Sequence, residues 1–241
     1  MTVAFDMMNP VTAHPVSKLI NFTRFMSIGD LQHMGPLGVL CWFLGSVLSE
    51  LHREIFNGNA EERLAQMWES IVEEYEEQGT QNRLGMLTEA MFNHGSTDFS
   101  CFIGKAAETL SLLPVLHKVC ISFHTGSPRD KHRLACFESL GNIFATCRLN
   151  GYRVPTDESD AMLRDCDRFM VHYNWLSQSN ISRNVLRYNI VFKVHMLWHI
   201  CYHAKFLNPK CTWCFEFEDF VGTMIISAKG CMVGSPFAIV G

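Results

Sequence analysis

Two acidic segments near opposite ends of the sequence are the first places where chemistry is expected. Asp30 and His33 are three residues apart in the segment Asp-Leu-Gln-His, which we expect at the junction of a strand and a helix. Glu218 lies among aromatic residues in the segment 215–222. A carboxylate in an apolar setting can be tuned for metal binding or for acid and base catalysis. Each segment also has a structural interpretation: a local ion pair for the first, and the acidic start of a helix for the second.

Histidines and cysteines form a second group with metal-binding potential. His195, His199 and His203 are spaced by four residues, which places them on one face of a helix. Cys211 and Cys214 form one Cys-x-x-Cys pair, which supplies half of a zinc site. His195 and His199 would complete it as a zinc site with two nitrogen and two sulfur ligands. The alternative is a packed helix whose histidines bond locally, followed by two free thiols.

Composition indicates a globular protein inside the cell. The chain has 241 residues, 48% of them hydrophobic, and a net charge of −4, which excludes a disordered chain. Its ten cysteines are spread singly, so we expect free, buried thiols. The uncharged apolar stretch from Met34 to Ser49 is shorter than the ~20 residues of a membrane span, and no signal peptide is expected. We therefore expect no contact with a membrane.

Charge is unevenly distributed along the chain. Residues 1–110 contain 6 Lys and Arg against 14 Asp and Glu, whereas residues 111–241 contain 14 against 10. A polyanion is therefore expected to bind the second half, although this half lacks the dense basic stripe typical of nucleic-acid-binding domains. The residues expected to contact phosphates are Arg129, Lys131, Arg133, Arg148 and Arg153.

Hydrophobic spacing predicts that these residues are positioned mainly by helices. The clearest helix spans 59–78, where Asn59 and Glu62 form a capping box and Gly79 ends the helix. Its many glutamates are expected on a solvated face, which would suit a protein partner. The other predicted elements are a strand at 22–28 and helices at 37–54, 82–92, 103–122, 131–149, 157–176 and 183–205.

Taken in order, three segments resemble the C-terminal half of CACTA-type transposases, which are DDE enzymes with an RNase H-like catalytic domain. The segment 30–33, followed by Leu37 and Gly38, is similar to the Asp-x-Met-His segment of that family, with Gln32 in place of the methionine. Residues 112–115 are similar to its Leu-Leu-Pro-hydrophobic helix. Residues 195–222 follow its order of His-x-Leu-x-x-His, Ala, Pro, Trp and a final Phe-Glu-aromatic-Gly.

The resemblance implies a mainly helical protein with remnants of an RNase H-like α/β domain. It implies an irregular lead-in at 1–25, an RNase H-like remnant at 26–58, a helical insertion at 59–190 and a C-terminal helical segment at 191–241. Asp30 and Glu218 would be catalytic Mg²⁺ ligands with His33 in support, and the chemistry would be two-metal phosphoryl transfer on DNA in the nucleus.

An RNase H-like site needs a further aspartate at the end of an early strand, and only Asp6 precedes Asp30. We therefore expect a fragment or degenerate copy with an incomplete acidic set, so that DNA contact is the expected function and catalysis is left open. The alternative function is a non-enzymatic helical protein-interaction module without a cofactor, whose partner binds the acidic helix 59–78.

Overall fold

A computed structural model of the chain describes residues 30–93, 95, 98–214 and 224. The predicted mainly helical class is confirmed, and no strand occurs among these residues. The predicted strand at 22–28 and the segment around Glu218 lie outside the described residues. The longer helices are α4 (Leu40–Glu50), α5 (Ala60–Glu77), α6 (Ala106–Ser122), α7 (Pro128–Leu149), α8 (Thr156–Ile181) and α9 (Phe192–His203).

The first described helix forms a continuous rod from Leu31 to Ile55. It joins α3 (Leu31–Met34) to α4, with one π-helical stretch before α4 (η3, Gly35–Val39) and one after it (η4, Leu51–Ile55). Residues 31–55, which we expected within an RNase H-like remnant, are therefore helical throughout, and that remnant stays a prediction. By length and composition the rod is apolar enough to cross a membrane, but 83% of its most apolar window is buried inside the bundle.

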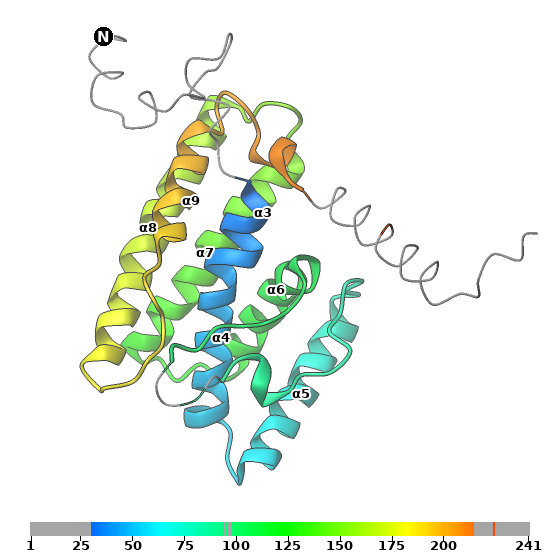
Figure 1. Ribbon diagram of the computed structural model, residues 1–241, viewed down its shortest axis with the longest axis vertical. Helices are drawn as coiled ribbons and strands as arrows, with labels where there is room; N and C mark the ends of the chain where they lie inside the picture. The colour runs from blue at the N-terminus through cyan, green and yellow to red at the C-terminus, as the bar shows by residue number, and fades with distance from the viewer. Residues whose placement is uncertain (1–29, 94, 96–97, 215–223, 225–241) are drawn as a thin grey trace, which may run out of the picture.

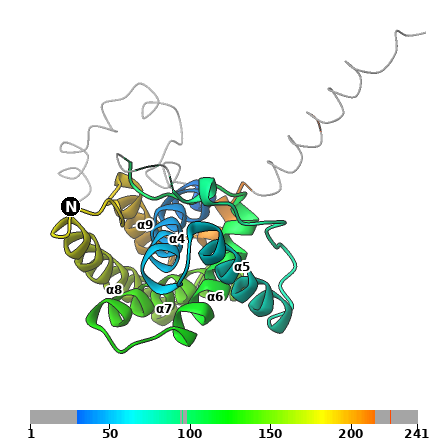
Figure 2. The same cartoon turned by 90° about the horizontal axis from the view of Figure 1, so that it is seen from below.

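The rod lies in the middle of a helical bundle. α6, α7, α8 and α9 surround it, and α5 lies on the outside against α6 and η4 (Figures 1 and 2). α7 and α8 form the most extensive helix pair. Two short 3₁₀ helices complete the described elements, η5 (Glu89–Met91) and η6 (Pro209–Thr212).

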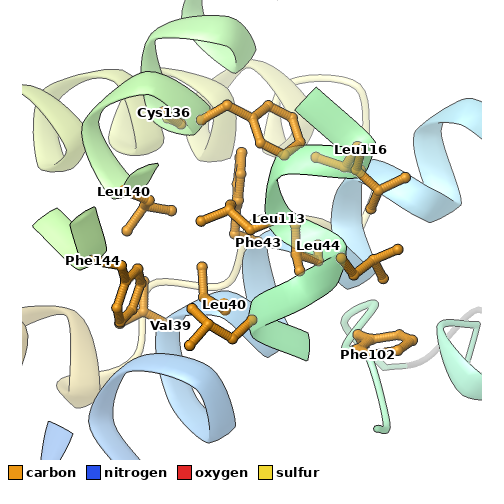
Figure 3. Packing of buried hydrophobic residues seen from close by; sticks show 14 of the residues in the cluster. Val39, Leu40, Phe43, Leu44, Phe102, Leu113, Leu116, Cys136, Leu140 and Phe144 are labelled. Carbon is orange, nitrogen blue, oxygen red and sulfur yellow. The ribbon is translucent and has the colours of Figure 1, made fainter. Parts of the chain in front are cut away.

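Aromatic and aliphatic side chains from the rod, α6 and α7 interlock in the core (Figure 3). Phe43 is fully buried, and its ring centroid lies 4.7 Å from that of Phe137 on α7. It also contacts Phe169 and Tyr173 on α8, so one ring joins three helices. Burying a side chain of this size contributes about 1.5–3 kcal/mol.

Several predicted helices occur close to their expected bounds. The capping box at Asn59 is confirmed, since its side chain accepts from the backbone N–H of Glu62 and Glu62 accepts from that of Asn59. α7 begins earlier than expected because Ser127 caps it and Pro128 suits the first helical position. The nine described cysteines form no disulfide, and six of them are buried, as expected.

Two helix predictions are wrong in part. Residues 82–92 contain only η5, because Leu84 and Leu87 are buried in an extended segment whose N–H at Leu84 bonds the Tyr75 hydroxyl at 3.4 Å. The helix expected from residue 183 begins only at Phe192. The reason lies at Asn184 and Tyr188, whose φ angles of 56° and 57° belong to the left-handed region and interrupt a right-handed helix.

Candidate functional site

Asp30 forms the N-cap of the rod. Its carboxylate accepts from the backbone N–H groups of Gln32 at 2.9 Å and His33 at 3.3 Å, and it also pairs with the imidazole Nδ1 of His33. Both carboxylate oxygens are therefore used within one helical turn, as in an ordinary helix cap. This arrangement is a poor fit for a Mg²⁺ ligand. Because Glu218 lies outside the described residues, the pairing of Asp30 with Glu218 stays a prediction.

The two histidines of the predicted zinc set lie together. The Nε2 atoms of His195 and His199 are 2.9 Å apart on α9, and the rings are perpendicular. Burial, and then the neighbouring His195, lowers the pKa of His199. Cys211 and Cys214 lie at and just after η6, and no group of three or more His, Cys, Asp or Glu residues suited to a metal occurs among the described residues. Of the predicted zinc ligands, the structure shows only that His195 and His199 are hydrogen-bonded to one another, and zinc binding stays a prediction.

The five predicted phosphate-contacting residues divide between the two ends of α7. Arg129, Lys131 and Arg133 lie in its first turns, whereas Arg148 lies in its last turn and Arg153 in the loop that follows. At 1.5 Å per residue, Lys131 and Arg148 are about 25 Å apart along the helix. The five residues therefore do not form one compact patch.

Arg129 and Arg133 belong to a charge cluster that joins the rod to α7. The guanidinium of Arg133 is buried and bonds Asp130 at 2.6 Å and Glu50 at 3.5 Å. Arg129 bonds Glu54 at 2.7 Å and Glu50 at 3.3 Å. Their charges are thus compensated inside the fold, so a phosphate would have to compete with carboxylates that are already in place.

The same cluster extends to the segment between α8 and α9. Arg183 bonds Glu54 at 2.9 Å, Arg187 also pairs with Glu54, and the Tyr188 hydroxyl donates to Glu50. Within the described part of the chain, the cluster thus has four arginines for three carboxylates. Breaking one buried ion pair of this kind leaves an uncompensated charge, so the cluster fixes three chain segments relative to one another.

Asp130 is the most strongly perturbed carboxylate of the cluster. Burial by itself would raise its pKa, but hydrogen bonds from Thr125 and Ser127 and the charge of Arg133 outweigh burial and lower the pKa to about 2. Thr125 donates to Asp130 through both its backbone N–H, at 2.9 Å, and its hydroxyl, at 2.6 Å. These bonds favour the ionised form, because an ionised carboxylate can only accept.

A different surface gathers exposed and partly buried cationic and aromatic side chains at the end of the bundle where α7 and α9 both finish, at the top of Figure 1. We call it the end surface. The side chains of Tyr152, Tyr202 and Phe206 on it are 69%, 41% and 44% exposed. Its members are Arg148, Tyr152 and Arg153 from α7 and the loop after it, and Tyr202, Lys205, Phe206 and Lys210 from the end of α9 and η6.

Asn208 holds the two halves of the end surface together. It is fully buried, and its side-chain amide donates to the carbonyls of Cys147 at 2.9 Å, Asn150 at 3.1 Å and Gly151 at 2.8 Å. Its backbone N–H donates to the carbonyl of Tyr152 at 2.8 Å. The chain after α9 is therefore fixed against the loop after α7.

Lysines order the end surface further. The ammonium of Lys205 lies 4.8 Å above the ring centroid of Tyr202 and 5.3 Å from that of Phe206. Lys210 donates to the carbonyls of Arg148 and Asn150. The sequence analysis named Arg148 and Arg153 as residues expected to contact phosphates. It did not name the aromatic residues and lysines of the end surface. The Asn208-Pro209 dipeptide predicts a turn after α9 but does not indicate which segment of the chain lies against it.

Comparison with known proteins finds no match to this chain among protein-family models, curated proteins or solved structures.

Proposed function

We propose that this chain is a transposase-derived helical protein that contacts DNA through the end surface. The observation that supports this proposal is that cationic and aromatic side chains lie at the same end of the bundle, on two segments that Asn208 fixes to one another. Cationic side chains neutralise phosphates, and aromatic rings stack on bases. The proposal assigns no catalytic step to Asp30, whose carboxylate serves as a helix cap.

The aromatic residues define the form of DNA that this surface would prefer. Tyr152 and Phe206 can stack only on bases whose faces are accessible, which in a duplex are those at ends or in opened regions. Arg148 and Arg153 would contact the flanking phosphates. We therefore expect single-stranded or unpaired DNA to bind more tightly than an intact duplex of the same sequence.

Hydrogen bonds within the protein already order the end surface in the absence of DNA. Because Asn208 and Lys210 bond the loop carbonyls internally, the loop after α7 does not have to be ordered on binding. The ring of Tyr202 already stacks on Trp198 and contacts the ammonium of Lys205, so its role is to hold that cation in place. Such preorganisation reduces the entropy lost on association.

A titration of fluorescently labelled single-stranded and duplex oligonucleotides, followed by anisotropy at several salt concentrations, tests the proposal. The double variant Arg148→Gln, Arg153→Gln should weaken single-strand binding and reduce the salt slope by about 0.7 for each phosphate that the variant no longer neutralises. Lys131→Gln is the control, because it removes an exposed cation from the same helix at the opposite end. Absence of binding at low salt, or an equal effect of Lys131→Gln per charge removed, would contradict the proposal.

The acidic face of α5 favours a second function, that of a protein-interaction module. Glu61, Glu69, Glu73, Glu76 and Glu77 are all exposed, whereas Met67, Ile71 and Tyr75 are buried. A basic protein partner would bind this face without disturbing the core. Reversing two charges, with Glu69→Lys and Glu73→Lys, should abolish capture of such a partner; unchanged capture would exclude α5 as its binding face.

A further inference from the structure

Two cysteines from distant parts of the chain lie against one another where the loop 98–105 crosses the rod. We propose that Cys101 in this loop is a site of reversible oxidation by a hydroperoxide, and that Cys41 in the rod is the thiol that converts the oxidised cysteine into a disulfide. This inference is independent of the proposed DNA contact.

The backbone of the loop is fixed to the rod at this point. The N–H of Phe102 donates to the carbonyl of Cys41 at 2.8 Å, and the side chain of Phe102 is buried. Gly45 lies one helical turn after Cys41, and a Cβ atom there would lie only 2.6 Å from the Cα atom of Cys101. The absence of a side chain at Gly45 thus lets the loop approach, and residues sixty positions apart in the sequence become neighbours.

The two sulfur atoms differ in their access to solvent. The thiols of Cys41 and Cys101 are hydrogen-bonded to one another. Cys41 is buried, whereas Cys101 is partly exposed, so a small oxidant reaches Cys101 first. Because the thiols are already in contact, a disulfide between them needs little movement of the backbone. An accessible thiol beside a second, resolving thiol is typical of cysteines that are oxidised reversibly.

The surroundings favour the thiolate at Cys101 and the protonated thiol at Cys41. The hydrogen bond from Cys41, and then the charge of Lys193, lower the pKa of Cys101 against the opposing effect of burial. The same hydrogen bond and burial raise the pKa of Cys41. The Cys41 thiol also donates to the carbonyl of Pro36 at 3.1 Å, so its proton has two acceptors. Since the thiolate is the nucleophilic form, Cys101 is the sulfur that reacts.

The oxidation takes two steps, and each is balanced. In the first, the Cys101 thiolate attacks one oxygen of the hydroperoxide, so that an S–O bond forms and the O–O bond breaks. The sulfur is oxidised to a sulfenic acid, and the other oxygen is reduced and leaves, with a proton from solvent, as water or an alcohol. In the second, the Cys41 sulfur attacks the sulfenic sulfur, the S–S bond forms, the S–O bond breaks, and hydroxide leaves with the Cys41 proton as water. A dithiol reductant restores both thiols by thiol–disulfide exchange.

A second pair of thiols provides an internal control. Cys166 on α8 and Cys201 on α9 are also hydrogen-bonded to one another, and this bond together with burial raises the pKa of Cys201 well above its ordinary value. Both residues are buried. The two pairs therefore share the contact between thiols, but the second pair lacks access to solvent and should stay reduced.

Oxidation of the reduced full chain with hydrogen peroxide at pH 7 tests the proposal without any substitution. The remaining thiols are blocked, and disulfide-linked peptides are identified by mass spectrometry. We expect a link between Cys41 and Cys101 that dithiothreitol removes, and no link between Cys166 and Cys201. The proposal is overturned if Cys41 and Cys101 stay unlinked, or if the buried pair is linked as readily.

Two variants test the separate roles of the two thiols. In Cys41→Ser the sulfenic acid of Cys101 has no resolving thiol, so it should accumulate and form an adduct with dimedone. Serine can still donate a hydrogen bond to Cys101. In Cys101→Ser we expect no adduct at Cys41, because its thiol is buried and protonated. The reverse pattern, with an adduct at Cys41 and none at Cys101, would contradict the assignment.

Cys201→Ser is the matched control, since it removes one thiol from the buried pair. It should leave the peroxide-induced disulfide between Cys41 and Cys101 unchanged, and its loss in this variant would count against the proposal. Circular dichroism of each variant before oxidation confirms that it is folded.

Discussion

Asp30 and Asn208 are two polar residues whose side-chain hydrogen bonds stabilise the fold. Asp30 resembled a catalytic acid in the sequence, but its bonds to two backbone N–H groups make it a helix cap. Asn208 had no such signal, yet its buried amide satisfies three carbonyls at once. Of the two interpretations of this segment, the structure shows the local pair of Asp30 with His33, while the use of the carboxylate as a helix cap depends on the backbone around it.

The carboxylate of Asp130 should make the free energy of unfolding depend on pH. Its pKa is about 2 in the folded protein and 3.8 ordinarily, so its ionisation stabilises the fold above about pH 4. This contribution, roughly 2 kcal/mol, is lost as the pH falls from about 4 to about 2. Asp130→Asn should lower the free energy of unfolding at pH 7 and flatten its decline over this range, measured by urea denaturation. Asp160→Asn, at an exposed position on α8, should leave both unchanged.

At the scale of elements, the sequence predicted best where amphipathic spacing and caps agree. α5, α6 and most of α7 occur where they were expected, because each has a buried stripe and a clear start. The segment 183–191 was wrongly included in a helix, since neither spacing nor propensity indicates that Asn184 and Tyr188 adopt positive φ. Their conformation is fixed by contacts across the fold: the Tyr188 backbone N–H donates to the Ser46 hydroxyl at 2.7 Å.

In the candidate sites too, the sequence predicts local contacts but not long-range ones. A helical repeat of four placed His195 and His199 together correctly, because that contact is local. The end surface joins residues about sixty positions apart, such as Asn208 and Cys147, and no local pattern predicts such a contact. The charge cluster also depends on long-range pairs, since Glu50 and Glu54 lie in the rod and their arginines follow much later in the chain.

Gly45 and Gly141 provide a matched test of how the rod packs. A Cβ atom at Gly45 would lie 2.3 Å from the backbone nitrogen of Phe102, whereas a Cβ at Gly141 in α7 would meet nothing within 4 Å. Gly45→Ala should therefore destabilise the protein by about 1–3 kcal/mol, the usual cost of overpacking. Gly141→Ala should stabilise it by about 0.5–1 kcal/mol through helix propensity. Equal effects in chemical denaturation would contradict the close approach of the 98–105 loop to the rod.

On the scale of the whole molecule, acidic residues occur both on α5 and beside the end surface, where Glu158 in the first turn of α8 accepts from the side chain of Asn150. The glutamates of α5 lie on the outside of the bundle at its lower right in Figure 1, whereas the end surface is at the top. The net charge of −4 therefore combines an acidic outer helix with charges of both signs at the other end of the bundle.

Hydrogen exchange of the full chain with and without a single-stranded oligonucleotide tests the proposed DNA contact most directly, because it maps the contacted surface without any substitution. We predict slower exchange in peptides covering 148–153 and 202–210 when DNA is bound, with no change in α5 or in the first turns of α7. Protection at residues 128–133 without protection of the end surface, or no protection at a DNA concentration that saturates binding, would contradict it.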